Sequence, residues 1–250
     1  MSVLLLDVKR FRLHRRIWTF YLALNGTNGK PLAWVLLPRH ELRSGYDLLL
    51  KHLKPQSPRL QAVVSDWHMG ILAAVIDHLP LVIHQQCALH VLQAVSRNFG
   101  GRWWHVTGYG RQHWTIFRRV ALGFPTERAA RLYLERMRRS YPQYAATFRI
   151  LRDGLPHIYQ FSHHSELNIP RTSNRIENFM GGLQQRLKTM PGAKTPQTLE
   201  GYINELVLMK SKVPTNELNS AWCCVVKPRK GRYHSRNEEV SILNVHAVQY

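Results

Sequence analysis

The sequence predicts an α/β fold with a mixed sheet, flanking helices and a helical insertion. Three strand-like segments follow one another in the first forty residues, and strand-like and helical segments then alternate over residues 41–97. Residues 98–168 show helical patterns without a strand pattern. Consecutive strands followed by strand–helix alternation are typical of a mixed sheet. We therefore expect one sheet whose helical layer is interrupted by an all-α insertion.

The first three strands are expected over residues 3–8, 17–24 and 31–37. Residues 17–24 read IWTFYLAL, an uncharged run rich in aromatic and β-branched side chains, which favours a strand buried on both faces. The glycines of the segment NGTNG at residues 25–29 allow positive φ and predict a turn. These segments together predict an antiparallel meander.

Helices and strands alternate in the next part of the chain. Helical spacing covers residues 41–53, 67–79 and 86–97, and the strand candidates between them are residues 60–65 and 81–84. In the second of these helices, four apolar residues at helical spacing predict the buried face. They are Met69, Leu72, Ala73 and Ile76.

The remaining elements are helical. The insertion is expected to hold helices at about 112–121, 126–139 and 143–152, and residues 111–139 carry eight arginines against two glutamates. Two further helices are expected over 173–188 and 196–211. The expected division is a first core part (1–97), the insertion (98–168), a second core part with two helices (169–212) and a basic, loosely ordered tail (213–250).

Charge predicts a polyanionic partner. The 250 residues include 35 Lys and Arg against 15 Asp and Glu, a net charge of +20. A strongly basic protein most often binds nucleic acid, and arginine binds phosphate in a bidentate manner. Three cysteines form no disulfide framework, which favours a reducing cytosol. No apolar run approaches the ~18 residues needed to span a bilayer. We therefore expect a cytoplasmic protein without a membrane segment.

Three acidic residues stand at the ends or starts of apolar elements. Asp7 and Asp66 each follow an apolar strand candidate, and Glu177 lies in the first turn of the helix expected over 173–188. If the two strands are neighbours, both aspartates leave the same sheet edge, and a packed helix could add Glu177. Such a set is a hard-oxygen site for Mg²⁺ or Mn²⁺. Two ions ~3.5–4 Å apart would suit displacement at a phosphodiester.

Each carboxylate also has a purely structural interpretation. Asp7 could be the polar end of an edge strand, and Asp66 could cap the helix over 67–79. Asn174 and Glu177 could form a capping box.

Four motifs in order resemble a known family. LLLD (4–7), VVSDWHMGILAAV (63–75), HQQCALHVLQAV (84–95) and TSNRIENFMGGLQQRLK (172–188) resemble the catalytic domain of DDE transposases of the Mutator-like group, which includes many bacterial insertion-sequence transposases. The separations are 66 − 7 = 59 and 177 − 66 = 111 residues. Cys87-x-x-His90 resembles the C/D-x-x-H motif of that group, and Thr172-x-Asn174-x-x-Glu177 resembles its T-x-N-x-x-E signature.

The resemblance implies an RNase H-like fold and a function in DNA transposition. It implies that Asp7, Asp66 and Glu177 are the catalytic triad and bind two Mg²⁺ or Mn²⁺ ions, with Cys87 and His90 as accessory residues. A metal-activated water would cleave the DNA at the end of the transposable element, and the 3′-hydroxyl released there would attack the target DNA. The implied partners are double-stranded transposon ends and target DNA, bound by a homo-oligomer in the bacterial cytoplasm at the nucleoid.

The resemblance starts at the first catalytic strand. Such transposases usually carry an N-terminal DNA-recognition region, whereas the first strand here is expected from residue 3. A truncated copy is therefore one interpretation. Two alternatives to transposition stay open: a metal-dependent nuclease of the same fold without strand transfer, and an inactive DNA-binding remnant.

Several further residues are candidates with two interpretations each. Asn174 is an accessory candidate from the signature. A zinc site at His84, Cys87 and His90 would need a fourth ligand, so a helix face with a satisfied histidine is favoured. Trp103 and Trp104 could stack on bases, although packing of the insertion onto the core is favoured. Three cationic side chains lie away from the apolar stripe of their helix and face either phosphate or solvent. They are Arg175, Arg186 and Lys188.

Overall fold

The computed structural model describes most of the chain outside the C-terminal region. The described residues are 2–13, 16–38, 40–53, 59–98, 109–189, 195–211 and 223–225. Predictions for Trp103, Trp104 and most of the tail lie outside these ranges. Among the described residues, no helix combines the length and apolar character that a membrane span requires.

One mixed sheet forms the centre of the molecule, in the order β5-β4-β1-β2-β3-β6. β1, β2 and β3 are antiparallel neighbours, whereas β4 pairs parallel with both β1 and β5, and β6 pairs parallel with β3. The strands are β1 (Val3–Leu13), β2 (Arg16–Asn25), β3 (Pro31–Leu37), β4 (Ala62–Ser65), β5 (Ile83–Gln86) and β6 (Cys223–Val225). The predicted mixed α/β sheet, with an antiparallel meander first and parallel strands after it, is confirmed.

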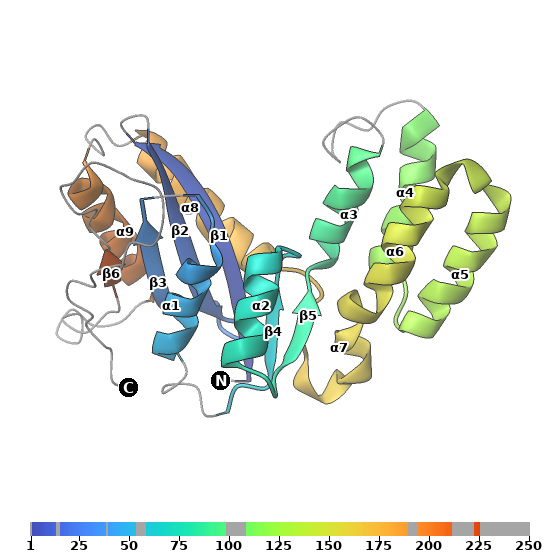
Figure 1. Ribbon diagram of the computed structural model, residues 1–250, viewed down its shortest axis with the longest axis horizontal. Coiled ribbons are helices and arrows are strands. Elements are labelled where there is room, and N and C mark those ends of the chain that lie inside the picture. Colours follow the sequence, from blue (N-terminus) through green and yellow to red (C-terminus); the bar gives the residue numbers. More distant parts are fainter. Residues whose placement is uncertain are drawn as a thin grey trace.

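Helices cover both faces of the sheet (Figure 1). α1 (Arg43–Leu53) and α2 (Met69–His78) pack on one face, and α8 (Asn174–Thr189) and α9 (Pro196–Ser211) pack on the other. Side chains alternate between the two faces along a strand. In β1, Leu4 and Leu6 therefore join the core under α1 and α2, whereas Val3 and Leu5 join the core under α8 and α9.

The described part of the chain between β5 and α8 is helical. Its helices are α3 (Ala88–Arg97), α4 (Tyr109–Leu122), α5 (Glu127–Ser140), α6 (Ala145–Ile158) and α7 (Gln160–His163), with short 3-10 helices at Pro142–Tyr144 and Ser165–Leu167. They enclose a hydrophobic cluster of their own, which includes Phe117, Leu134, Phe148 and Leu151. Figure 1 shows this helical body beside the β5 edge of the sheet. The predicted mixed sheet with flanking helices and an all-α segment before the Glu177 helix is confirmed.

The predicted buried face of α2 is wrong. The side chains of Met69 and Ile76 are 71% and 58% exposed, whereas Ile71, Ala74 and Val75 are buried against the sheet. The helix reads MGILAAVI and is apolar on almost every side. Hydrophobic spacing therefore could not select one face, and contact with the sheet decides it.

Two strand boundaries also differ from expectation. β1 continues to Leu13, because residues 7–13 keep pairing with β2 after the pairing with β4 ends. Asp7 therefore lies within a strand and does not end one. Residues Cys223–Val225 form β6, although no strand pattern is visible in the tail. A three-residue strand is too short for alternation to identify it.

Candidate active site

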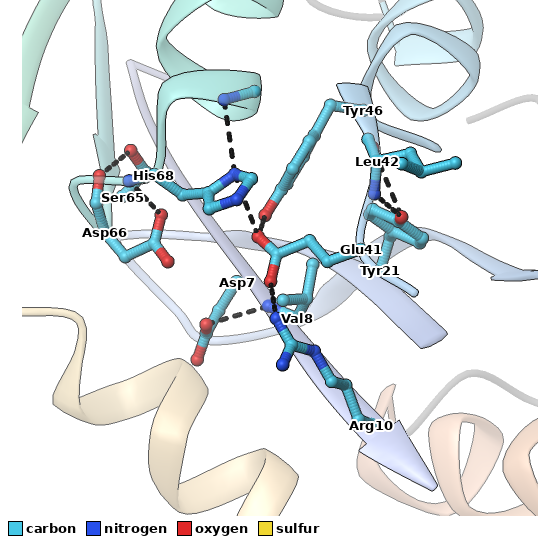
Figure 2. Close-up of polar contacts among 11 residues, drawn as sticks. Asp7, Val8, Arg10, Tyr21, Glu41, Leu42, Tyr46, Ser65, Asp66 and His68 are labelled. Atoms are coloured by element: carbon cyan, nitrogen blue, oxygen red, sulfur yellow. Dashed lines mark hydrogen bonds and ion pairs between the residues drawn. The ribbon is translucent and has the colours of Figure 1, made fainter. Parts of the chain in front are cut away.

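Asp7 and Asp66 each stand two residues past the last pair of two neighbouring parallel strands, Leu5 with Val64. The parallel register pairs Val3 with Ala62 and Leu5 with Val64, an offset of 59 residues, which is also the separation of the two aspartates. Parallel neighbours are about 4.8 Å apart. Residues 3, 5, 62 and 64 all face α8, and the alternation of β1 directs Asp7 to the same face, while Asp66 directly follows the end of β4. Figure 2 shows both carboxylates on the same side of β1.

Glu177 reaches this place from the first turn of α8. Ile176, Met180 and Leu183 anchor the helix on the sheet, in the same core as Val3 and Leu5. The hydroxyl of Ser173 donates a hydrogen bond of 2.7 Å to Oε1 of Glu177. Glu177 therefore stands at the edge of the buried stripe with its carboxylate oriented by the residue that precedes the helix.

The environment of Asp7 disfavours its charge. Burial raises the pKa of Asp7 to about 7, with His90 and the backbone N–H of Val8 acting against this shift, and the charges of Asp66 and Glu177 add to it. Burial also raises the pKa of Asp66. Asp7 thus interacts electrostatically with both other predicted carboxylates.

His90 is the cation of this region. Burial lowers the pKa of His90, but the hydrogen bond and charge of Cys87 and the charges of Asp7 and Glu177 outweigh burial and raise it to about 9. His90 is in α3, and its Nδ1 lies 4.0 Å from Oε1 of Glu177. Cys87 is fully buried, and its Sγ accepts a hydrogen bond from the backbone N–H of Ser173 (3.3 Å) and lies 3.1 Å from the hydroxyl oxygen of the same residue.

The three carboxylates supply the oxygen ligands that a divalent cation such as Mg²⁺ prefers. Among the described residues, one group of three brings its ligand atoms within 4.8 Å of one another, and that group is Cys87, His90 and Glu177. Asp7, Asp66 and Glu177 are spread more widely than this. Two ions ~3.5–4 Å apart need a wider ligand set than one ion does. A buried aspartate whose charge is opposed by burial and by two like charges also fits a cation in its neighbourhood.

The structural interpretation of Asp66 as the cap of α2 is wrong. The residue that caps α2 is His68, whose side chain accepts a hydrogen bond from the N–H of Gly70. Oδ1 of Asp66 accepts instead from the N–H of His68, at 3.2 Å. The proposed capping box is not observed either, because α8 begins at Asn174 itself and Glu177 contacts Ser173.

Other candidates lie elsewhere. His84 does not join Cys87 and His90, because its Nε2 hydrogen-bonds Oγ of Ser65 at 2.7 Å. Asn174 lines a cavity of about 620 Å³ with Thr172 and Arg175.

The three cationic candidates are exposed on α8. Arg175 donates to the carbonyls of Gly26 and Thr27, both at 2.6 Å. Arg186 contacts Sδ of Met209, at 3.7 Å. Their role in DNA binding, and that of Lys188, stays a prediction.

Glu41 is a residue of this region that sequence reasoning missed. Its side chain is only 6% exposed, accepts a hydrogen bond of 2.6 Å from the hydroxyl of Tyr46 and pairs with Arg10 at 3.0 Å. Nδ1 of His68 lies 3.3 Å from it, and its charge acts on Asp66 (Figure 2). Through Arg10 and His68, Glu41 links β1 to the turn that follows β4. A glutamate in a polar segment just before a helix carries no signal of burial, so only the fold could reveal it.

The chain belongs to a family of transposases. The family model for "Transposase, Mutator family" matches residues 35–192, a span that includes Asp66, Cys87, His90 and Glu177 but not Asp7. The predicted family membership is confirmed. No protein among those with curated descriptions matches the sequence.

A solved structure with a similar chain is a cryo-EM structure of a simian T-cell lymphotropic virus intasome in complex with the PP2A regulatory subunit B56 gamma. The two chains share 10% identity with a TM-score of 0.29, and the match covers 48% of each chain.

Proposed function

We propose that this chain is a DDE transposase that cleaves and joins DNA strands at the site formed by Asp7, Asp66 and Glu177. The observation that supports the proposal is the parallel register of β1 and β4, whose last pair, Leu5 and Val64, stands two residues before Asp7 and Asp66. Membership in the Mutator family supports DNA transposition as the process.

The acidic and basic side chains of the site would have different roles. Asp7, Asp66 and Glu177 would hold two Mg²⁺ or Mn²⁺ ions, which when bound supply Lewis-acid stabilisation of both oxygens in an in-line displacement at phosphorus. Protonated His90 compensates the carboxylates and could donate a hydrogen bond to a phosphate oxygen. Ser173 keeps the Glu177 carboxylate directed to the site.

The basic surface would hold the DNA. A net charge of +20 favours binding to the phosphate backbone independently of sequence. Exposed Arg186 and Lys188 lie on the same helix as Glu177 and are candidates to contact a strand next to it. We propose transposon ends and target DNA as partners, bound by more than one copy of the chain at the nucleoid. We also propose the division into core (1–97 and 169–212), insertion (98–168) and tail (213–250).

Nicking of supercoiled plasmid by the full chain tests the proposal. With Mg²⁺ or Mn²⁺ we expect nicking, and we expect Asp7→Ala and Glu177→Ala each to reduce it by at least about 10²-fold. Asp153→Ala is the matched control, because Asp153 is an exposed carboxylate of α6 and should leave nicking unchanged. Nicking that survives both substitutions would overturn the assignment.

A strand-transfer assay separates the alternatives. An oligonucleotide with a pre-cut 3′-hydroxyl end should be joined to plasmid by a transposase. Nicking without joining would favour the nuclease, and DNA binding without metal-dependent nicking would favour the inactive remnant.

A further inference from the structure

Beside the three carboxylates lies a group of ligands of a different chemical kind. Sγ of Cys87, a ring nitrogen of His90 and a carboxylate oxygen of Glu177 all lie within 4.8 Å of one another. We propose that this group binds a thiophilic divalent cation of the zinc class, and that such an ion withdraws Glu177 from the proposed catalytic set.

The donor atoms select the class of ion. Thiolate and imidazole are preferred by Zn²⁺ and its heavier analogue Cd²⁺, whereas Mg²⁺ prefers oxygen ligands only. One sulfur, one nitrogen and one oxygen supply three of the four positions of a tetrahedral zinc site. Glu177 would therefore take part in two mutually exclusive ligand sets, one of hard oxygen atoms and one that includes sulfur.

The local structure supports a prearranged site. Nδ1 of His90 is buried, accepts or donates no hydrogen bond within the described part of the chain, and lies 4.0 Å from Oε1 of Glu177. The thiol of Cys87 is fully buried and accepts a hydrogen bond from the backbone N–H of Ser173, whose hydroxyl lies 3.1 Å from Sγ and donates to Glu177. Ser173 thus fixes two of the three ligands relative to each other. His90 and Glu177 are partly exposed, so an ion can enter from their side.

The chain offers a direct spectroscopic test. Cd²⁺ titrated into the full-length protein should give a thiolate-to-cadmium charge-transfer band that saturates at one ion per chain. Cys87→Ser, made in a chain that also carries Cys223→Ser and Cys224→Ser, should abolish the band, because no other cysteine then remains to bind Cd²⁺. A double Cys223→Ser, Cys224→Ser variant is the matched control, because it leaves Cys87 as the sole cysteine and should keep the band.

The other two ligands are tested in the same way. His90→Ala and Glu177→Gln should each weaken Cd²⁺ binding by at least about tenfold. Circular dichroism confirms that each variant is folded, and a variant that fails this check is replaced by His90→Gln or Glu177→Ala. A band that persists in the cysteine-free variant, or that is unaffected by both other substitutions, would overturn the site and leave Cys87 and His90 as a hydrogen-bonded pair only.

The claim that such an ion withdraws Glu177 from the catalytic set rests on the proposed function and is tested separately, by DNA nicking. Micromolar Zn²⁺ should suppress Mg²⁺-dependent nicking in the wild-type chain, and Cys87→Ser should nick with less sensitivity to Zn²⁺. If the wild-type chain does not nick at all, the proposed function fails while the Cd²⁺ titration still decides the site. Equal Zn²⁺ sensitivity of both proteins would overturn the inhibitory role.

Discussion

At the scale of single residues, the buried carboxyl of Asp7 lowers the free energy of unfolding of the metal-free protein at neutral pH. Asp7 lies within a strand, and burial and two neighbouring carboxylates raise its pKa to about 7. Asp normally titrates near 3.9. Between these values the folded protein without metal binds more protons at this position than the unfolded chain does. The contribution of Asp7 to the free energy of unfolding therefore falls as pH rises from about 4 to 7.

Asp7→Asn should therefore stabilise the metal-free protein at pH 7. The expected gain in the free energy of unfolding is at most about 4 kcal/mol, because the pKa of Asp7 rises from about 4 to about 7 on folding and one pKa unit corresponds to about 1.36 kcal/mol. The gain should shrink toward pH 4. Urea unfolding in EDTA at both pH values measures this gain. The control Asp153→Asn should change stability by less than about 0.5 kcal/mol. A destabilised Asp7→Asn protein at pH 7 would contradict the assigned environment.

Unlike the carboxyl of Asp7, the buried carboxylate of Glu41 should stabilise the fold, because a tyrosine hydroxyl donates a hydrogen bond to it and an arginine pairs with it. Glu41→Leu should lower the free energy of unfolding by about 2–4 kcal/mol, because it leaves the hydroxyl of buried Tyr46 without its acceptor and unpairs Arg10. Glu41→Gln keeps an acceptor and should cost less.

The surface pair of Glu135 and Arg138 gives the comparison for Glu41. Glu135→Gln should cost less than about 0.5 kcal/mol, because both partners are partly exposed. Chemical denaturation compares the three variants. Equal stability of Glu41→Leu and wild type would exclude a structural role for Glu41.

At the scale of elements, the turn after β4 is supported by the insertion. Trp67 follows Asp66 directly, and its ring packs on Gly154 of α6 and lies 6.2 Å from the ring of His157. A Cβ on Gly154 would lie 2.8 Å from Cη2 of Trp67. The insertion therefore contacts the residue next to a proposed catalytic aspartate.

Gly154→Ala and Gly182→Ala should change stability in opposite directions. Gly154→Ala forces Trp67 to move and should cost about 1–3 kcal/mol. Gly182 lies inside α8, and no described residue lies within 4 Å of an added Cβ, so Gly182→Ala should stabilise the helix by about 0.5–1 kcal/mol. Thermal unfolding measures both. Destabilisation by Gly182→Ala would show that α8 does not have open space at this position.

At the scale of the whole molecule, charge dominates binding. Because binding to DNA releases counterions, log Kobs should fall linearly with log [salt]. If six to ten phosphates are contacted, affinity should fall by about 10³–10⁵-fold between 50 and 200 mM salt. Fluorescence anisotropy with a labelled duplex of arbitrary sequence measures the slope. A slope near zero would contradict backbone binding.

The amount that the sequence predicts differs between elements for physical reasons. β2 and β3 agree with prediction within a residue or two because apolar runs and a glycine turn delimit them. The face of α2 and the strand β6 were not predictable, because one is apolar all round and the other is three residues long.

The sequence by itself determined the mixed α/β class, the helical insertion, the basic charge and the identity of three candidate carboxylates. Local periodicity and composition carry this information along the chain. Only the tertiary structure decided that residues 59 apart stand side by side, that Cys87 and His90 gather at Glu177, and that Glu41 is buried near Asp66. Strand register and helix packing depend on contacts between distant segments, which no local pattern records.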